Sequence, residues 1–471
     1  MKIQKRSLLF VVCAALVLPL AAQKDPKSLK YPDLEFKPLK PDHIAVGKNF
    51  DFYFKENHEA PTVDMAIIIG GGSLLDPKDK PGLAALTYQL LASGGSTTIK
   101  PEQVEERLDF LGSSIYAYAG SEFGVIQVSS LTKNFDKTWL ILTDLLLHPA
   151  FAPARLDLEK KKELEGILRR WDMPMMVGFT LFQDLVYGQD YPEVRRTTRK
   201  GVEAITENDI RQYYDSHIRD RAIVIAASGD FRGEKMAGQV KTSLSAWKGL
   251  PPQKLDIPKA ILAAKPGLYL IDKPDMNQAV VMMGHLGINR LDADLVESNI
   301  LNGIYGSGAF NSRLWREVRS NRGLAYTASG LVGSGRDLGL FYTFCMTKSQ
   351  SAGEAISVIR DVIKDMVQNP VKPEELETAK KSEINSFVFR FENSQSLLLR
   401  TIMQRLYGFP ADYNETYLAK IKKVDAAKVL QMAKRFLHPE QLVILVVGKK
   451  ADLLEQLKKL GEVTVLPLPR D

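Results

Sequence analysis

The chain has 471 residues, of which 45% are hydrophobic and 25% charged, a composition typical of globular proteins. A chain of this length is too long for one ordinary hydrophobic core. At roughly 150 residues per domain it predicts two to four structural units. The formal net charge is +7, but no long block of like charges occurs. Composition therefore excludes a largely disordered chain and gives no indication of a nucleic-acid partner.

The N-terminus resembles a targeting segment. Three basic residues within the first six precede an apolar run over residues 8–20, a pattern typical of a secretory signal peptide, which we assign to residues 1–23. The run is shorter than the roughly 20 residues that span a membrane, so no transmembrane segment is predicted. Cleavage would lower the formal charge from +7 to +4 by removing those three residues. We therefore expect a secreted protein, located in the periplasm.

The mature chain begins with an arm and a first domain. Residues 24–44 carry four prolines among charges, which favours an extended arm. The first α/β domain is assigned to residues 45–247. Its strands are predicted over 50–55, 62–69, 114–119, 125–130 and 222–228, and its main helices over 82–93, 101–111, 135–147 and 153–170. Runs of strands interrupted by helix pairs indicate an α+β arrangement rather than a doubly wound parallel sheet.

The second half of the sequence repeats the first. Three landmarks recur at nearly one offset: Tyr187-Gly188 with Tyr407-Gly408, Pro149 with Pro370, and Gly229 with Gly448. Residues 267–471 therefore form a second α/β domain, joined by a Pro- and Lys-rich linker over 248–266. The predicted fold class is α+β: two homologous α/β halves, each a mixed, mainly antiparallel sheet with helices packed on one face, together forming a clamshell.

Common catalytic motifs are missing from the sequence. The three glycines Gly303, Gly306 and Gly308 lack the spacing of a dinucleotide-binding loop and indicate close backbone approach instead. The six histidines are scattered, with no two within five positions, so no self-contained metal site is predicted. Of the two cysteines, one lies in the signal peptide. The other, Cys345, lies in an apolar strand-like run and is predicted to be a buried structural thiol.

One stretch, residues 312–326, combines a basic amphipathic helix with a tyrosine. Its apolar residues follow a helical spacing, Gly323 ends the helix, and a strand follows. This order brings Arg319 close to Tyr326. Taken alone, these residues favour a surface helix with a solvated charged face and a half-buried tyrosine.

The duplicated halves and the stretch SRLWREVRSNRGLAY together resemble the pitrilysin/insulinase metallopeptidases, or inverted zincins. That family includes mitochondrial processing peptidase subunits and bacterial two-subunit peptidases. The segment GLAALTYQLLASGGST falls where active members carry H-x-x-E-H. The resemblance implies that Ala85 and Gln89 replace the two zinc-binding histidines and that Tyr88 replaces the general-base glutamate. The third ligand falls near Glu165 or Gly166, between which the alignment does not decide.

The resemblance further implies what this chain can and cannot do. A lone carboxylate does not hold Zn²⁺ without nitrogen ligands, so this chain is expected to bind no metal or cofactor and to be inactive alone. The family's second-half Arg and Tyr, seven residues apart, match Arg319 and Tyr326. They would act in trans, the tyrosine donating to the oxyanion of a scissile carbonyl whose zinc belongs to a homologous partner subunit.

Substrate contacts are also implied by the resemblance. The loop with Gly303, Gly306 and Gly308 is similar to one that lines the family's substrate chamber, and the strand over 116–122 matches an edge to which an extended peptide adds. The expected substrates are peptides or unfolded polypeptides. Two alternatives remain open: a non-enzymatic peptide-binding or assembly scaffold of the same fold, and an independent hydrolase with an unorthodox metal site.

Overall fold

The structure is a computed structural model that describes residues 37–251 and 253–469. The predicted signal peptide and most of the predicted arm lie outside these residues. From Pro38 onward the chain forms one compact unit. Within the described ranges, no helix is both long and apolar enough to cross a membrane.

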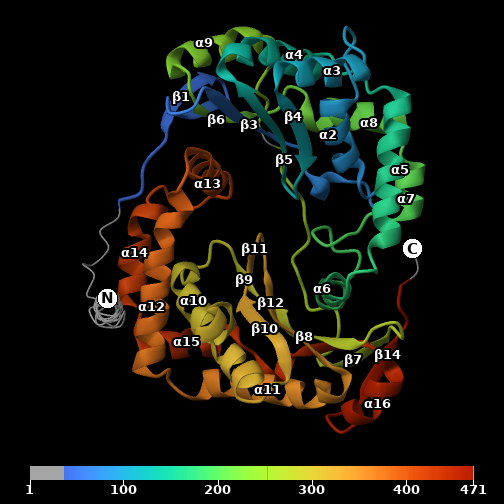
Figure 1. Cartoon of the computed structure of the whole chain (residues 1–471), viewed down its shortest axis with the longest axis vertical. Helices are drawn as coiled ribbons and strands as arrows, with labels where there is room; N and C mark the ends of the chain where they lie inside the picture. The colour runs from blue at the N-terminus through green and yellow to red at the C-terminus, as the bar shows by residue number, and fades with distance from the viewer. Residues whose placement is uncertain (1–36, 252, 470–471) are drawn as a thin grey trace, which may run out of the picture. The chain divides into compact units, whose positions relative to one another are not determined.

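The first half builds a six-stranded sheet in the order β1-β2-β6-β3-β5-β4, drawn in the upper part of Figure 1. Its only parallel pair is β2 with β6, and the other neighbours are antiparallel. The strands are β1 (Asp42–Gly47), β2 (Phe50–Glu56), β3 (Thr62–Gly70), β4 (Ser114–Ala119), β5 (Phe123–Leu131) and β6 (Ile223–Gly229).

One face of this sheet is covered by the helices of the same half. Alternation along β3 turns Met65, Ile67 and Ile69 toward these helices, where they join one large buried cluster. The helices are α2 (Leu83–Ser93), α3 (Pro101–Leu111), α4 (Phe135–Leu147), α5 (Pro153–Arg169), α7 (Arg199–Ala204), α8 (Glu207–Tyr213) and α9 (Gly233–Ser243).

The second half repeats the topology in a sheet of order β14-β7-β13-β8-β12-β10. Its strands are β7 (Gly267–Asp272), β8 (Gln278–Leu286), β10 (Ala325–Val332), β12 (Leu340–Lys348), β13 (Val443–Gly448) and β14 (Val463–Leu466), with a short parallel pair β9 (Ile288–Asn289) and β11 (Ser334–Gly335). Its helices are α10 (Leu295–Asn302), α11 (Ala352–Gln368), α12 (Pro373–Phe387), α14 (Tyr413–Lys423), α15 (Ala426–Phe436) and α16 (Lys450–Lys458). Five strands follow one topology in both halves, whereas the edge strand β1 is antiparallel and the edge strand β14 parallel to its neighbour; the two mixed sheets confirm the predicted fold class.

The two halves exchange one helix each. Helix α6 (Pro174–Tyr187) lies in the first half of the sequence, yet its buried residues pack on β8 and β13. Helix α13 (Ser394–Leu406) lies in the second half, and Leu398 and Ile402 pack against Ile68 and Ala226 of the first sheet. Figure 1 shows α13 below the first sheet and α6 above the second. Each sheet is thus covered on its second face by a helix from the other half.

The repeat landmarks mark equivalent points of these elements. Gly188 and Gly408 follow α6 and α13, and both have φ of +82°. Gly229 and Gly448 end the equivalent central strands β6 and β13. The single described thiol, Cys345, is fully buried in β12, as predicted, and burial raises its pKa to about 12.

Candidate functional site

The predicted degenerate zinc box lies on α2, which packs against α5 and the edge strand β4. Ala85 and Gln89, one turn apart, are partly exposed on the same face of α2, where two metal-binding nitrogens would have to lie. The methyl group of Ala85 and the amide of Gln89 cannot coordinate zinc as two imidazole rings would. The residues present therefore do not fit a catalytic zinc ion, and we derive no chemistry from one on this chain.

Tyr88, the residue at the general-base position, is fully buried. Its hydroxyl donates to the carbonyl of Gly70 at 2.6 Å, at the end of β3. Its ring lies directly over Gly124 of β5, where an added Cβ would fall 1.8 Å from the ring. Burial also raises the pKa of the phenol, so Tyr88 stays neutral. The position that would need a carboxylate facing a substrate instead holds a packed aromatic ring.

The predicted position of the third zinc ligand does not form a metal site either. Glu165 and Gly166 are both exposed on α5. Across residues 37–251 and 253–469, no group of three or more His, Cys, Asp or Glu side chains is arranged to hold a metal ion.

Arg319 and Tyr326 are brought together by two irregular pieces of backbone. Arg319 lies on a π-helical turn over Trp315–Ser320, which Gly323 ends with φ of +62°. Tyr326 follows at the start of β10, where the register with β12 shifts between Ala325 and Thr327. Such a bulge at a sheet edge redirects a side chain, and 78% of the Tyr326 side chain is exposed. The sequence predicted the proximity of the two residues and a helix ending at Gly323, but neither the π turn nor the bulge.

The Arg319 guanidinium lies between two aromatic rings. Its central carbon is 4.2 Å from the centre of the Trp315 ring and 4.6 Å from that of Tyr326. Both distances are within the range of attractive cation–π contacts. Within the described part of the chain, neither the guanidinium nor the Tyr326 hydroxyl makes a hydrogen bond or ion pair. Their polar groups are free for an external ligand.

The base of this helix is fixed by a buried ion cluster. Arg313 donates to both oxygens of Glu375, at 3.0 and 2.6 Å, and to Asp365 at 2.6 Å, and Arg316 adds a third bond to Glu375. Burial disfavours the charge on Glu375, but the hydrogen bonds, first among them that from Arg313, outweigh it and lower its pKa to about 2. The helix that carries Arg319 is thereby held to α12.

The three predicted chamber glycines have different surroundings. Gly303 and Gly308 line a polar cavity of about 210 Å³ beside α12. Gly306 instead packs on the backbone of Gly330 in β10, since an added Cβ would lie 2.5 Å from that carbonyl oxygen. Close packing is the clear role of Gly306, while contact of the loop with substrate stays a prediction.

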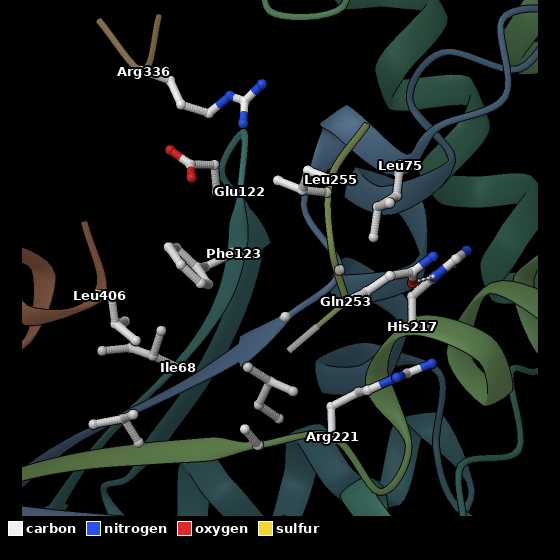
Figure 2. Close-up of a pocket in the computed structure, with 15 residues that line it drawn as sticks. Ile68, Leu75, Glu122, Phe123, His217, Arg221, Gln253, Leu255, Arg336 and Leu406 are labelled. Carbon is white, nitrogen blue, oxygen red and sulfur yellow. Dashed lines mark hydrogen bonds between the residues drawn. The ribbon is translucent and has the colours of Figure 1, made fainter. Parts of the chain in front are cut away.

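A second cavity, of about 230 Å³, lies at the end of β3 and is shown in Figure 2. It is mainly apolar, with Ile68, Phe123 and Leu255 among its walls. His217, hydrogen-bonded to Gln253 at 2.7 Å, lies on one side, and the charged residues Glu122 and Arg336 lie on another. Glu122, at the end of the predicted peptide edge, lines this cavity, whereas the box residues, the three glycines and the Arg319–Tyr326 pair do not.

Most charges near this cavity are already paired, and the Arg221 guanidinium donates to the carbonyl of Ser216. Glu122 binds Arg290, and Arg336 lies 3.4 Å from Glu193. The cavity is therefore suited to a small apolar group rather than to an ion. Its residues come from the first sheet, the linker and the second half, so sequence spacing alone could not have assembled them.

The repeated fold and the altered box define a metallopeptidase-like protein whose zinc-box positions carry no metal ligands. Two family models match the chain: one described as "Insulinase (Peptidase family M16)" over residues 52–185, and one described as "Peptidase M16 inactive domain" over residues 204–383. The chain belongs to this insulinase family, as a non-catalytic member. The resemblance predicted from the sequence is confirmed.

Similar proteins agree with this assignment. The chain is 24% identical over 400 residues to the "Non-peptidase homolog YmxG" of Helicobacter pylori, covering 84% of this chain and 91% of that protein. It is 22% identical to a "Probable mitochondrial-processing peptidase subunit beta" of Arabidopsis thaliana, covering 85% and 76%. The crystal structure of a "peptidase M16 inactive domain" from Pseudomonas fluorescens shares the fold, with a TM-score of 0.76 at 21% identity, covering 87% of this chain and 98% of that one.

Proposed function

We propose that this protein is the zinc-free subunit of a secreted, periplasmic heteromeric metallopeptidase and that it supplies Arg319 and Tyr326 to the active site of a zinc-bearing homologous subunit. The observation that carries the proposal is the state of this pair. Tyr326 is 78% exposed, and the hydroxyl and the neighbouring guanidinium have no partner within the described ranges. Exposed polar groups that have no hydrogen-bond or ion-pair partner in the protein are available to bind a ligand.

The chemistry of the pair suits peptide hydrolysis. When a scissile carbonyl is attacked, negative charge develops on its oxygen, and a donor aimed at that oxygen stabilises the transition state. The Tyr326 hydroxyl would be that donor, and Arg319 would add positive charge beside it. Loss of one such donor typically costs about 10²- to 10³-fold in kcat. The partner subunit would supply the metal and the attacking water, and the substrates would be peptides or unfolded polypeptides.

The test combines the purified chain with a zinc-bearing homologue from the same organism, carrying H-x-x-E-H, and follows cleavage of a quenched fluorescent peptide. We expect turnover only with both chains present. Tyr326→Phe should lower kcat by about 100-fold without changing the affinity between the subunits. Tyr269→Phe is the control, because the Tyr269 hydroxyl donates to the carbonyl of Lys265 and belongs to none of the predicted substrate contacts, so its loss should leave kcat unchanged.

Three results would contradict the proposal. An unchanged rate for Tyr326→Phe would exclude the catalytic role. Peptide binding without turnover in the presence of every zinc-bearing homologue would favour the scaffold alternative. Stoichiometric zinc in the pure chain, with chelator-sensitive activity, would favour an independent hydrolase. The location is tested separately, by sequencing the N-terminus of the native protein from a periplasmic extract.

A further inference from the structure

Arg319 and Tyr326 belong to a longer stack of side chains. The Phe310 ring meets the Trp315 ring edge-to-face, with centres 4.6 Å apart and planes at 74°. The Trp315 ring in turn contacts the Arg319 guanidinium, which also contacts the Tyr326 ring. Phe310 is 74% exposed and Tyr326 is 78% exposed, so the stack lies at the surface. The stack thus runs from the Phe310 ring through the Trp315 ring and the Arg319 guanidinium to the Tyr326 ring.

The glycine loop before the helix places the first ring of this stack. Gly308 packs so closely on Gly303 that an added Cβ would lie 2.2 Å from its carbonyl oxygen. The next residue, Ala309, has φ of +46°, a left-handed conformation that is strained for alanine. A short 3₁₀ turn over Ala309–Asn311 then carries Phe310 onto Trp315. The strain at Ala309 is explained if the backbone must place the Phe310 ring against Trp315.

The stack restrains the guanidinium without using its hydrogen-bonding capacity. A guanidinium carries its five N–H donors around the edge of a plane, so contacts with its two faces leave the donors free. A long Arg side chain in water otherwise samples many rotamers, and fixing it beforehand lowers the cost of binding. Trp315 is four residues before Arg319, the spacing at which side chains on one helical turn meet.

We propose that Trp315, backed by Phe310, is a positioning residue that holds Arg319 against Tyr326, so that the guanidinium and the hydroxyl meet the backbone carbonyl oxygens of an extended peptide together. This inference rests on the proposed function of the pair and extends it to two residues that touch neither substrate nor metal. Trp315 acts through Arg319, and Phe310 acts through Trp315.

The first measurement is spectroscopic and needs no partner subunit. In the full chain labelled with ¹⁵N-arginine, the Nε–Hε signal of Arg319 is assigned by its loss in Arg319→Lys. Ring currents should shift it upfield of the signal of Arg322, which pairs with Glu317 instead. Trp315→Leu should move the signal toward the position of exposed arginines, and Trp315→Phe should largely keep it. An Arg319 signal that does not respond to Trp315→Leu would show that the stack does not exist.

The second measurement is catalytic, in the complex with the zinc-bearing subunit. Trp315→Leu should lower kcat by about 10- to 100-fold, since misplacement of a catalytic group by about 1 Å has that effect, with unchanged subunit affinity. Trp315→Phe should restore most of the rate. Phe310→Ala should have a smaller effect in the same direction. Phe110→Ala, which removes an equally exposed ring from α3, should have none.

The outcomes separate this inference from the proposed function. A shifted signal with a wild-type rate in Trp315→Leu would refute positioning while leaving the role of Tyr326 intact. If the wild-type complex cleaves nothing, the proposed function fails. The same variants are then compared for affinity of the isolated chain toward a fluorescein-labelled unfolded peptide. Weaker binding by Trp315→Leu, rescued in Trp315→Phe, would support positioning, and equal binding by all three would refute it.

Discussion

The substitution Gly124→Ala tests whether the ring of Tyr88, in the predicted zinc box, packs directly against Gly124. The added Cβ would lie 1.8 Å from the ring, about 1.6 Å less than the 3.4 Å at which ordinary contact begins. Tyr88 is fully buried, so the ring cannot move into solvent. Overpacking costs about 1–3 kcal/mol, and displacing the hydroxyl from the Gly70 carbonyl adds about 1–3 kcal/mol for the group left unpaired. We expect a loss of about 2–6 kcal/mol in the free energy of unfolding.

Urea denaturation followed by circular dichroism measures this loss, with Gly166→Ala as control because its Cβ would meet nothing within 4 Å. The decisive comparison is the double variant. In a Tyr88→Ala background, which itself costs about 3–5 kcal/mol, Gly124→Ala should add less than about 0.5 kcal/mol, since the ring it would strike is gone. Additive losses, or a Gly124→Ala protein as stable as the wild type, would refute the placement of the ring.

Three further predictions concern the surroundings of the site. Glu375→Gln should destabilise the protein by about 3 kcal/mol at neutral pH, because it removes the buried carboxylate that pairs with the buried Arg313 and leaves that arginine only the half-exposed Asp365. The pKa of Glu375 is lowered from 4.5 to about 2, so the wild type should lose this contribution as pH falls from about 4.5 toward 2, and acid titration of the variant should lack that step. Gly178→Val should cost about 1–3 kcal/mol in urea, because even a Cβ there would lie 2.6 Å from Val280; a neutral result would contradict the exchange of α6. Tyr326→Ala should change the unfolding free energy by less than about 0.5 kcal/mol, since its side chain is 78% exposed.

Much of the fold could be predicted because local signals agree with the final structure. The helices over 101–111 and 135–147 have the predicted bounds, each begun or ended by Pro or Gly or by a change in hydrophobic period. The repeat landmarks identified equivalent elements: Gly188 and Gly408 share one positive φ after α6 and α13, and Gly229 and Gly448 end the central strands β6 and β13. Pattern and repeat were therefore sufficient to predict two sheets of one topology.

What escaped prediction depends on contacts between distant segments. The exchange of α6 and α13 leaves no trace in hydrophobic period, because a helix buries the same apolar stripe whichever sheet it covers. The π turn and the bulge add single residues to otherwise regular elements and have no fixed sequence signature. The proximity of Arg319 and Tyr326 was predicted from the helix ending at Gly323, whereas the contact of Arg319 with Trp315 was not predicted.

The predicted zinc box and the Arg319–Tyr326 pair differ in what they contribute to the fold. Tyr88 has joined the core, where its ring and hydroxyl now contribute to stability. Tyr326 contributes little to stability, because its phenol is exposed and the neighbouring Arg319 guanidinium makes no ion pair within the described residues. The backbone around the pair is irregular, with a bulge, a π turn and a strained Ala309. Irregular backbone of this kind costs stability, and a fold kept only as a scaffold would gain from regular pairing there. The irregular backbone around Tyr326 is therefore consistent with the ligand-binding role proposed for the pair, whereas Tyr88 contributes to packing.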